Sequence, residues 1–261
     1  MPELHRFSRT ELLIGRDGLE RLRNCSVAVF GLGGVGGHAA EALCRAGVGR
    51  LVLVDFDEVC RTNINRQIIA LDDTVGRPKV QVMAERMLLI NPEVEIVPCR
   101  EFYSAGNSPV LLGEGYDYVL DCIDHITSKL HLIRSCRDMG LPVVSSMGAA
   151  NKLDPTCIRV GDISATHTCR MARIVRKLLK KHGVEQGVTV VFSTEEFSEP
   201  AASDVRCGQG CACPDRDIPG VSCRRRNVTL GSISYIPAIF GLTMAGVVVN
   251  NLLQGITGGA R

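Results

Sequence analysis

The sequence lacks both a strong net charge and a hydrophobic segment at its start, and each absence weakens a class of function. Its 30 basic and 28 acidic residues leave a formal charge of +2, so no overall electric field attracts nucleic acid. The opening MPELHRFSRTELL contains no apolar run of the kind that a signal peptide has, which predicts a cytoplasmic, reducing environment. We therefore expect most of the 12 cysteines to be free thiols.

The chain also lacks an internal repeat and a long uninterrupted apolar run. Its most apolar segment, residues 236–253, is short for a membrane span and contains Pro237, Asn250 and Asn251, which favours a buried helix. With 261 residues, 45% of them hydrophobic, the chain has enough apolar surface for one sizeable core. We predict a single domain with no membrane partner.

What the sequence does contain is a regular alternation of β-branched runs and helical patterns. This alternation predicts an α/β, Rossmann-like, doubly wound fold, whose mostly parallel sheet has helices on both faces. We expect an N-terminal helical arm at 1–24, a nucleotide-binding core at 25–150, and a C-terminal elaboration at 151–261 with a cysteine-rich loop at 193–232. Strands are expected at 27–30, 51–54, 94–97, 118–120, 143–145, 158–160 and 188–192, and helices at 10–22, 37–46, 79–90, 128–139, 170–182 and 236–253.

A glycine-rich turn, FGLGGVGG, follows the first predicted strand. Gly31 permits a tight turn, Gly33 lets a phosphate approach the backbone, and Gly36 lets the next helix pack closely on the strand. Asp55 ends the second predicted strand, where a carboxylate can accept hydrogen bonds from ribose hydroxyls, although a turn or cap residue is the alternative. These features predict a nucleotide site and fit NAD and ATP equally.

Three charged residues that follow successive strands favour ATP over NAD. Arg66, Lys79 and Asp124 lie in DFDEVCRTNINRQ, GRPK and DCIDHITSK. Attack on an α-phosphate needs cations at the phosphates and a carboxylate for a metal ion, whereas hydride transfer does not. Each residue also has a simpler interpretation: Arg66 as a surface ion pair, Lys79 as a first-turn helix residue, and Asp124 as a helix cap. Their joint occurrence at these places supports an ATP site.

The motifs GLGGVG, DFDEVCRTNINRQ, GRPK and DCID together resemble the adenylating superfamily that includes the ubiquitin-activating enzymes and the bacterial activators of sulfur-carrier proteins. Within it, RFSRTELLIG, SSMGAANKLDP, GDISATHT and GSISYIPAIFGLTMAG resemble the tRNA threonylcarbamoyladenosine dehydratases, also called cyclases. The resemblance covers nearly the whole chain except about residues 193–226. It implies a single adenylating-enzyme domain over residues 1–261.

The resemblance implies ATP-dependent ring closure on the modified adenosine beside the tRNA anticodon. The threonyl carboxylate attacks the α-phosphate of ATP and gives an acyl-adenylate and pyrophosphate. The carbamoyl group of the same side chain then closes on the activated carbonyl and expels AMP, so no external nucleophile is needed. Ring closure gains from proximity because both reacting groups belong to one side chain.

The resemblance also implies roles for individual residues. Asn63 and Arg66 contact the phosphates, Lys79 neutralises charge as pyrophosphate leaves, and Asp124 holds Mg²⁺ near the α-phosphate. Asp55 holds the ribose within a larger nucleotide-binding set. That set comprises Gly31, Gly33, Gly34, Gly36, Asp55, Asp57, Arg66, Lys79 and Asp124.

The arm before the first strand carries the motif RFSR. Arg9, with Arg6 as the second choice, resembles the arm arginine that dimers of the superfamily send into the neighbouring subunit's ATP site. This resemblance implies a homodimer and a catalytic role for Arg9. A solvated arm residue is the alternative.

The helix predicted at 170–182 has one basic face, with Met171, Ile174, Val175 and Leu178 elsewhere on its surface. The pattern fits an ordinary solvated face or a strip that contacts tRNA phosphates, and we favour the strip because the implied substrate is RNA. Cys169 and Arg170 replace the usual Asp-Pro of the dehydratases, so the resemblance does not describe the start of this helix. The basic residues are Arg170, Arg173, Arg176, Lys177, Lys180 and Lys181, and CRRR at 223–226 extends the set.

The cysteine-rich loop holds a Cys-x3-Cys-x-Cys-x9-Cys pattern formed by Cys207, Cys211, Cys213 and Cys223. Four thiolates suit a structural zinc ion, but the spacing is not the common paired Cys-x-x-Cys. Zinc and free or redox-active thiols therefore both stay open, with a persulfide-carrying role as a third interpretation. A sulfurtransferase partner is a further candidate.

Two other functions share parts of this site. The first is adenylation of the C-terminus of a ubiquitin-like sulfur-carrier protein, which uses the same ATP site. The sequence lacks the paired Cys-x-x-Cys motifs of such activators, and GAANKLDP and ISATHT also argue against it. The second is a dinucleotide-dependent oxidoreductase or a nucleotide-binding regulator, which Arg66, Lys79 and Asp124 disfavour. Titration with NAD and with ATP separates these cases.

Overall fold

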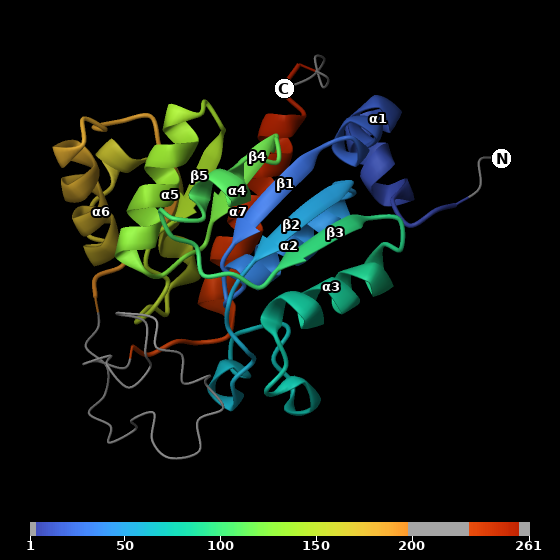
Figure 1. Ribbon diagram of the computed structural model, residues 1–261, viewed down its shortest axis with the longest axis horizontal. Coiled ribbons are helices and arrows are strands. Elements are labelled where there is room, and N and C mark those ends of the chain that lie inside the picture. The colour runs from blue at the N-terminus through green and yellow to red at the C-terminus, as the bar shows by residue number, and fades with distance from the viewer. Residues whose placement is uncertain (1–3, 198–229, 256–261) are drawn as a thin grey trace.

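The computed structural model describes residues 4–197 and 230–255, and a seven-stranded sheet forms the centre of this part of the chain (Figure 1). The strand order is β3-β2-β1-β4-β5-β7-β6. Neighbouring strands are parallel except β6 and β7, which are antiparallel. This sheet confirms the predicted Rossmann-like fold. The strands are β1 (Ser26–Phe30), β2 (Arg50–Val54), β3 (Glu95–Cys99), β4 (Tyr118–Asp121), β5 (Val143–Ser146), β6 (Ile158–Asp162) and β7 (Thr189–Ser193).

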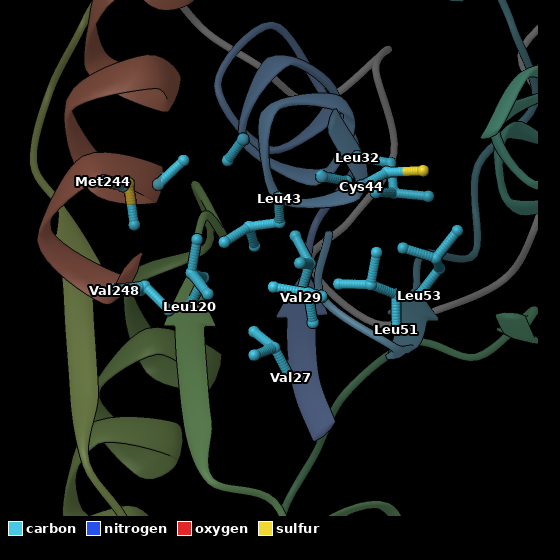
Figure 2. Close-up of a cluster of buried hydrophobic side chains, with 14 of the residues drawn as sticks. Val27, Val29, Leu32, Leu43, Cys44, Leu51, Leu53, Leu120, Met244 and Val248 are labelled. Atoms are coloured by element: carbon cyan, nitrogen blue, oxygen red, sulfur yellow. The ribbon is translucent and has the colours of Figure 1, made fainter. Parts of the chain in front are cut away.

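Helices cover both faces of the sheet and bury the inner parallel strands on two sides, whereas the edge strand β3 is partly exposed. On one face lie α2 (Gly36–Ala46), α3 (Lys79–Ile90) and α7 (Tyr235–Leu252). Figure 2 shows how this helical layer packs on the strands: Leu43 of α2 and Met244 of α7 lie in one cluster with Val29 of β1 and Leu120 of β4. The other face is covered by α4 (Ser108–Leu112) and α5 (Ile126–Asp138), and α6 (Arg170–Lys181) packs beside α5.

The helix α7 is a core helix of this domain, as the sequence predicted. By length and composition alone it is apolar enough to cross a membrane. Its Phe240, Met244 and Val248 side chains are nevertheless fully buried against α2 and the sheet. Gly241 permits this packing, because a Cβ at that position would lie 2.2 Å from the carbonyl oxygen of Val35, the residue before α2.

The N-terminal arm forms α1 (Ser8–Arg23), which extends beyond the predicted 10–22. Gly15 breaks it into two helical pieces, since its φ of 75° and ψ of 172° lie outside the helical region. Leu19 and Leu22 of the second piece are buried in the domain. Leu12 and Leu13 of the first piece are 86% and 83% exposed.

The main differences from the predicted elements are local. β3 begins at Glu95, one residue after the expected start. α5 begins at Ile126, two residues before the expected start, because the His125 side chain caps this helix by accepting from the Ser128 backbone N–H. The α4 helix was not predicted because five residues are too few to show an apolar period. Four short 3₁₀ helices in the described residues were also not predicted: η1 (Arg61–Asn63), η2 (Asp72–Thr74), η3 (Pro155–Cys157) and η4 (Ile163–Ala165).

Candidate nucleotide site

The glycine-rich turn lies at the carboxyl end of β1, where the strand order reverses between β2 and β4. Ligands bind at such a point in open α/β sheets. Gly31 has a φ of 91°, and a Cβ on it would lie 2.9 Å from the Cys122 carbonyl oxygen. A Cβ on Gly36 would lie 1.8 Å from the Gly31 carbonyl oxygen, so α2 enters the turn too closely for any side chain. Both positions therefore require glycine.

The two inner glycines of the turn differ from each other. A Cβ on Gly33 would have the Gln67 Nε2 at 3.8 Å as its nearest neighbour, which leaves the backbone open to approach by a ligand. A Cβ on Gly34 would lie 2.9 Å from Pro237 Cβ at the start of α7 and 3.2 Å from the Arg66 carbonyl oxygen. Gly34 thus has a packing role of its own, whatever it contributes to a nucleotide.

Asp55, which follows β2, connects the glycine-rich turn to the next loop. It is 8% exposed, and its Oδ2 accepts a hydrogen bond of 2.6 Å from the Leu32 backbone N–H. Its Oδ1 accepts one of 2.8 Å from the Asp57 backbone N–H. Each carboxylate oxygen has a second lone pair, so this arrangement fixes the carboxylate and still permits it to accept from a ribose hydroxyl.

Lys79 brings a buried positive charge to this edge of the sheet. It begins α3 and is 5% exposed, and its Nζ donates a 2.9 Å hydrogen bond to Asp57 Oδ2. Burial alone lowers the pKa of Lys79, but the carboxylates of Asp55 and Asp57 outweigh burial and raise it, with a smaller contribution from Asp124. Burial raises the pKa of Asp55, and the Lys79 ammonium opposes that shift. These carboxylates therefore favour the charged form of Lys79.

Asp124 lies in the loop between β4 and α5 and is exposed. The Asp124 carboxylate makes a small contribution to the raised pKa of Lys79. A carboxylate oxygen is the ligand type that Mg²⁺ prefers, so the donor chemistry fits the ion. Among residues 4–197 and 230–255 no group of three or more His, Cys, Asp or Glu side chains could hold a metal. A magnesium ion at Asp124 therefore needs nucleotide phosphates and water as its other ligands.

Asn63 and Arg66 both take part in the structure of their own loop. Asn63 is 9% exposed, and its Oδ1 accepts a 3.0 Å hydrogen bond from the Cys60 backbone N–H, which closes η1. Arg66 is half-buried, and its Nη1 donates to the Thr62 carbonyl oxygen at 2.8 Å and to Asn65 Oδ1 at 2.9 Å. These contacts hold the arginine side chain along the loop that follows Asp57.

The structure shows a second buried lysine that the sequence analysis missed. Lys129 of α5 and Asp121 of β4 are both 0% exposed, and the Lys129 Nζ lies 2.7 Å from Asp121 Oδ2. The Lys129 Nζ also donates to the Ser146 carbonyl oxygen, and the Ser145 hydroxyl donates to Asp121 Oδ2 at 2.5 Å. Asp121 Oδ1 accepts from the Ile123 backbone N–H, so the pair supports the loop that carries Asp124. The sequence signal that could have indicated its burial is the position of Lys129 among the apolar residues of its helix.

The other predicted residues lie away from this cluster. Arg9 is exposed on α1, whereas the Arg6 Nη1 donates to the Ile90 carbonyl oxygen of its own chain at 2.8 Å. On α6, Arg173, Lys177 and Lys180 are exposed, and Arg176 instead donates to Thr166. The expected apolar face is only partly correct, because Val175 is buried and Ile174 is 47% exposed. Cys207, Cys211, Cys213, Cys223 and the CRRR segment lie outside the described residues.

The glycine-rich turn, the carboxylates and the buried lysine define the site of an adenylating enzyme. The ThiF family model matches residues 7–259, and the chain belongs to the ThiF family. A tRNA threonylcarbamoyladenosine dehydratase of Bacillus subtilis is 46% identical over 253 residues, which are 97% of this chain and 96% of the relative. The crystal structure of the Escherichia coli tRNA N6-threonylcarbamoyladenosine dehydratase in complex with ATP matches with a TM-score of 0.81 and 35% identity, over 95% of this chain and 93% of that one. The resemblance to the dehydratase branch is confirmed.

A relative with a different function is also similar. The molybdopterin-synthase adenylyltransferase of Escherichia coli is 38% identical, over 83% of this chain and 92% of the relative. This adenylyltransferase is less identical to the chain, and matches a smaller share of it, than the Bacillus subtilis dehydratase.

Proposed function

We propose that this protein dehydrates threonylcarbamoyladenosine in tRNA at the expense of ATP, through an acyl-adenylate. The observation that carries the proposal is the buried Lys79 ammonium, which Asp57 holds beside the glycine-rich turn. The near full-length similarity to dehydratases supports the choice of substrate. Adenylation of a sulfur-carrier protein is the second candidate, supported by the similarity to the molybdopterin-synthase adenylyltransferase.

In the first step the threonyl carboxylate attacks the α-phosphorus of ATP, the bond to the β-phosphate breaks, and pyrophosphate leaves. Negative charge on the departing pyrophosphate is stabilised by Lys79 and Arg66, which the protein holds in place before the reaction. Asp124 would hold Mg²⁺, which supplies Lewis-acid stabilisation of the phosphate oxygens when bound. Asp55 accepts from the ribose and fixes the nucleotide relative to the turn.

In the second step the carbamoyl group of the same side chain attacks the activated carbonyl, loses a proton, and expels AMP. The enzyme has to hold two parts of one side chain in a reactive arrangement rather than bring in a second substrate. Positioning of this kind accounts for a large part of the rate in intramolecular reactions. The net change in the tRNA is the loss of one water.

The experiment that tests the proposal is incubation with ATP, Mg²⁺ and threonylcarbamoylated tRNA, followed by mass analysis of the nucleosides. We expect the modified adenosine to lose the mass of one water, in an amount equal to the AMP formed. A parallel incubation with the C-terminal peptide of a sulfur carrier tests the second candidate. If the peptide yields pyrophosphate and a peptidyl-adenylate, and the tRNA yields neither AMP nor a loss of water, the dehydratase proposal is wrong.

We propose that the exposed basic face of α6 contacts the phosphates of tRNA. Arg173, Lys177 and Lys180 are exposed on this face, whereas Ala172, Val175 and Leu179 anchor the helix to the domain. Replacing the three basic residues by glutamine should weaken tRNA binding and flatten its salt dependence, because phosphate contacts release counterions. ATP affinity should stay unchanged. An unchanged salt slope would identify an ordinary solvated face.

We propose that the protein is a homodimer in which Arg9 acts in the neighbouring subunit's ATP site. The exposed leucines of the first piece of α1, Leu12 and Leu13, support a contact of the arm with another chain. Mixing an Arg9→Ala subunit with an Asp124→Ala subunit should restore part of the activity, since one site of the mixed dimer then holds both groups. Demonstrably mixed dimers without recovery would refute this role.

The remaining predictions concern the cysteine-rich loop, a partner protein and the location in the cell. We propose a zinc ion at Cys207, Cys211, Cys213 and Cys223, with free thiols as the alternative, and elemental analysis of the purified protein distinguishes the two. A sulfurtransferase partner and a cytoplasmic location also remain proposals.

A further inference from the structure

Two segments that are distant in the sequence meet at Asn151, just beyond the carboxyl end of β5. The Asn151 backbone N–H donates to the Gly231 carbonyl oxygen at 2.9 Å, and the Gly231 N–H donates to Asn151 Oδ1 at 2.5 Å. Asn151 has a φ of 54°, a left-handed conformation that a non-glycine residue rarely adopts. This double hydrogen bond joins the loop after β5 to the segment that leads into α7.

The Asn151 side chain retains an unused hydrogen-bond donor in a buried place. Asn151 is 8% exposed, and among the described residues its buried Nδ2 has no hydrogen-bond partner. The orientation of the amide is fixed, since a flipped amide would point its N–H groups at the Gly231 N–H. Buried amide donors without a partner are rare in folded proteins, so this one indicates a ligand acceptor.

The junction at Asn151 is continuous with the nucleotide site. Ser232 follows Gly231, and its carbonyl oxygen accepts a 3.0 Å hydrogen bond from Asn65 Nδ2 in the loop that carries Arg66. Pro237, further along the same segment, packs on Gly34 of the glycine-rich turn. The segment 231–237 therefore contacts Asn151, the loop that carries Arg66, and the glycine-rich turn.

We propose that the Asn151 amide binds an oxygen of the threonylcarbamoyl group and so distinguishes modified tRNA from unmodified tRNA. The inference rests on the proposed function. The threonylcarbamoyl group offers a carboxylate and a ureido carbonyl, both acceptors that match an N–H donor. The sugar and phosphates of ATP are already assigned to the glycine-rich turn, Asp55 and Lys79 in the proposed function, which leaves the Asn151 donor for the other substrate.

The test measures the affinity of the protein for two forms of one tRNA, with and without the threonylcarbamoyl group. Asn151→Asp keeps the acceptor for the Gly231 N–H and removes the unused donor. Asn24→Asp, at the C-terminal end of α1, makes the same change in charge on the amino side of β1 and serves as the matched control. We expect Asn151→Asp to lose about tenfold of the preference for the modified tRNA, with unmodified tRNA and ATP bound as before. Asn24→Asp should keep the full preference.

A second variant at the same position separates the loss of the donor from the effect of the added charge. Asn151→Gly accepts the left-handed conformation without adding a charge, and it should lose the same preference. ATP binding reports on the fold of each variant. If both variants bind ATP and still prefer modified tRNA as strongly as the unaltered protein does, Asn151 has no such role. If the unaltered protein itself neither prefers modified tRNA nor forms AMP with it, the proposed function fails instead.

Discussion

Two buried lysines at the carboxyl edge of the sheet have opposite surroundings. Lys129, between β4 and β5, has Asp121 and the Ser146 carbonyl oxygen as close acceptors, and neither member of its ion pair is exposed. Lys79, beside β2, donates to Asp57, whose side chain is 42% exposed. A charge whose acceptors all lie inside the protein has a structural role, and here it supports the loop that carries Asp124. A charge that is held at an open edge can still interact with a phosphate.

The largest expected effect is on stability at the closed pair. Lys129→Met keeps the approximate volume and leaves the Asp121 carboxylate buried without its partner, so it should lower the free energy of unfolding by about 3–5 kcal/mol. Lys79→Met should lower it less, because Asp57 can be solvated and Asp55 keeps its two backbone hydrogen bonds. Urea unfolding of both variants measures the difference. Equal losses would show that the two lysines have the same structural role.

A control isolates the charge from the packing at this pair. Asp121→Leu combined with Lys129→Met removes both charges, and replacing a whole buried ion pair by apolar groups is often neutral. We expect the double variant to be more stable than Lys129→Met alone. A double variant that is less stable than either single variant would show that packing, and not the unpaired charge, causes the loss.

The second effect is on catalysis at the open edge. Lys79→Ala, Arg66→Ala and Asp124→Ala should each reduce the rate of AMP formation by about 10²- to 10³-fold, because each removes one charge held in place for the phosphates. Circular dichroism and urea unfolding monitor the fold of each variant. Near-normal turnover in all three would contradict the assignment of this edge as the adenylation site.

The smallest expected effect is that of pH on the contribution of Lys79 to stability. Burial lowers the pKa of Lys79, but Asp55 and Asp57 raise it overall above the ordinary value of 10.5. A raised pKa means that the contribution of the charge is complete below 10.5 and declines only as the pH rises through the higher folded value. The stability difference between the unaltered protein and Lys79→Met should therefore stay constant from about pH 7 to about pH 9.5. A difference that shrinks within this range would mean that Lys79 loses its proton there.

The sequence predicted the features that depend on neighbouring residues. The β-branched runs gave the strands, and the glycine spacing gave the turn, because strand propensity and the space around Gly31 and Gly36 are local properties. The placement of Lys79 at the first turn of α3 followed from the preceding Pro78.

The sequence could not predict which distant segments meet. The Lys129–Asp121 pair, the packing of Pro237 on Gly34 and the Asn151–Gly231 junction each join residues from different elements. No periodicity or spacing specifies such a contact, because it is set by the order and twist of the strands. The break in α1 was not predicted for another reason. A glycine such as Gly15 within a helical pattern is compatible with either a straight helix or a break.

The most direct test of the central claim follows the oxygen atoms of the threonyl carboxylate. If that carboxylate is labelled with heavy oxygen in the tRNA, attack on the α-phosphate transfers one labelled oxygen to AMP when the ring closes. We predict that each AMP released carries one labelled oxygen and that the ring product keeps the other. Unlabelled AMP formed together with ring product, or label found in inorganic phosphate, would contradict activation of the carboxylate by adenylation.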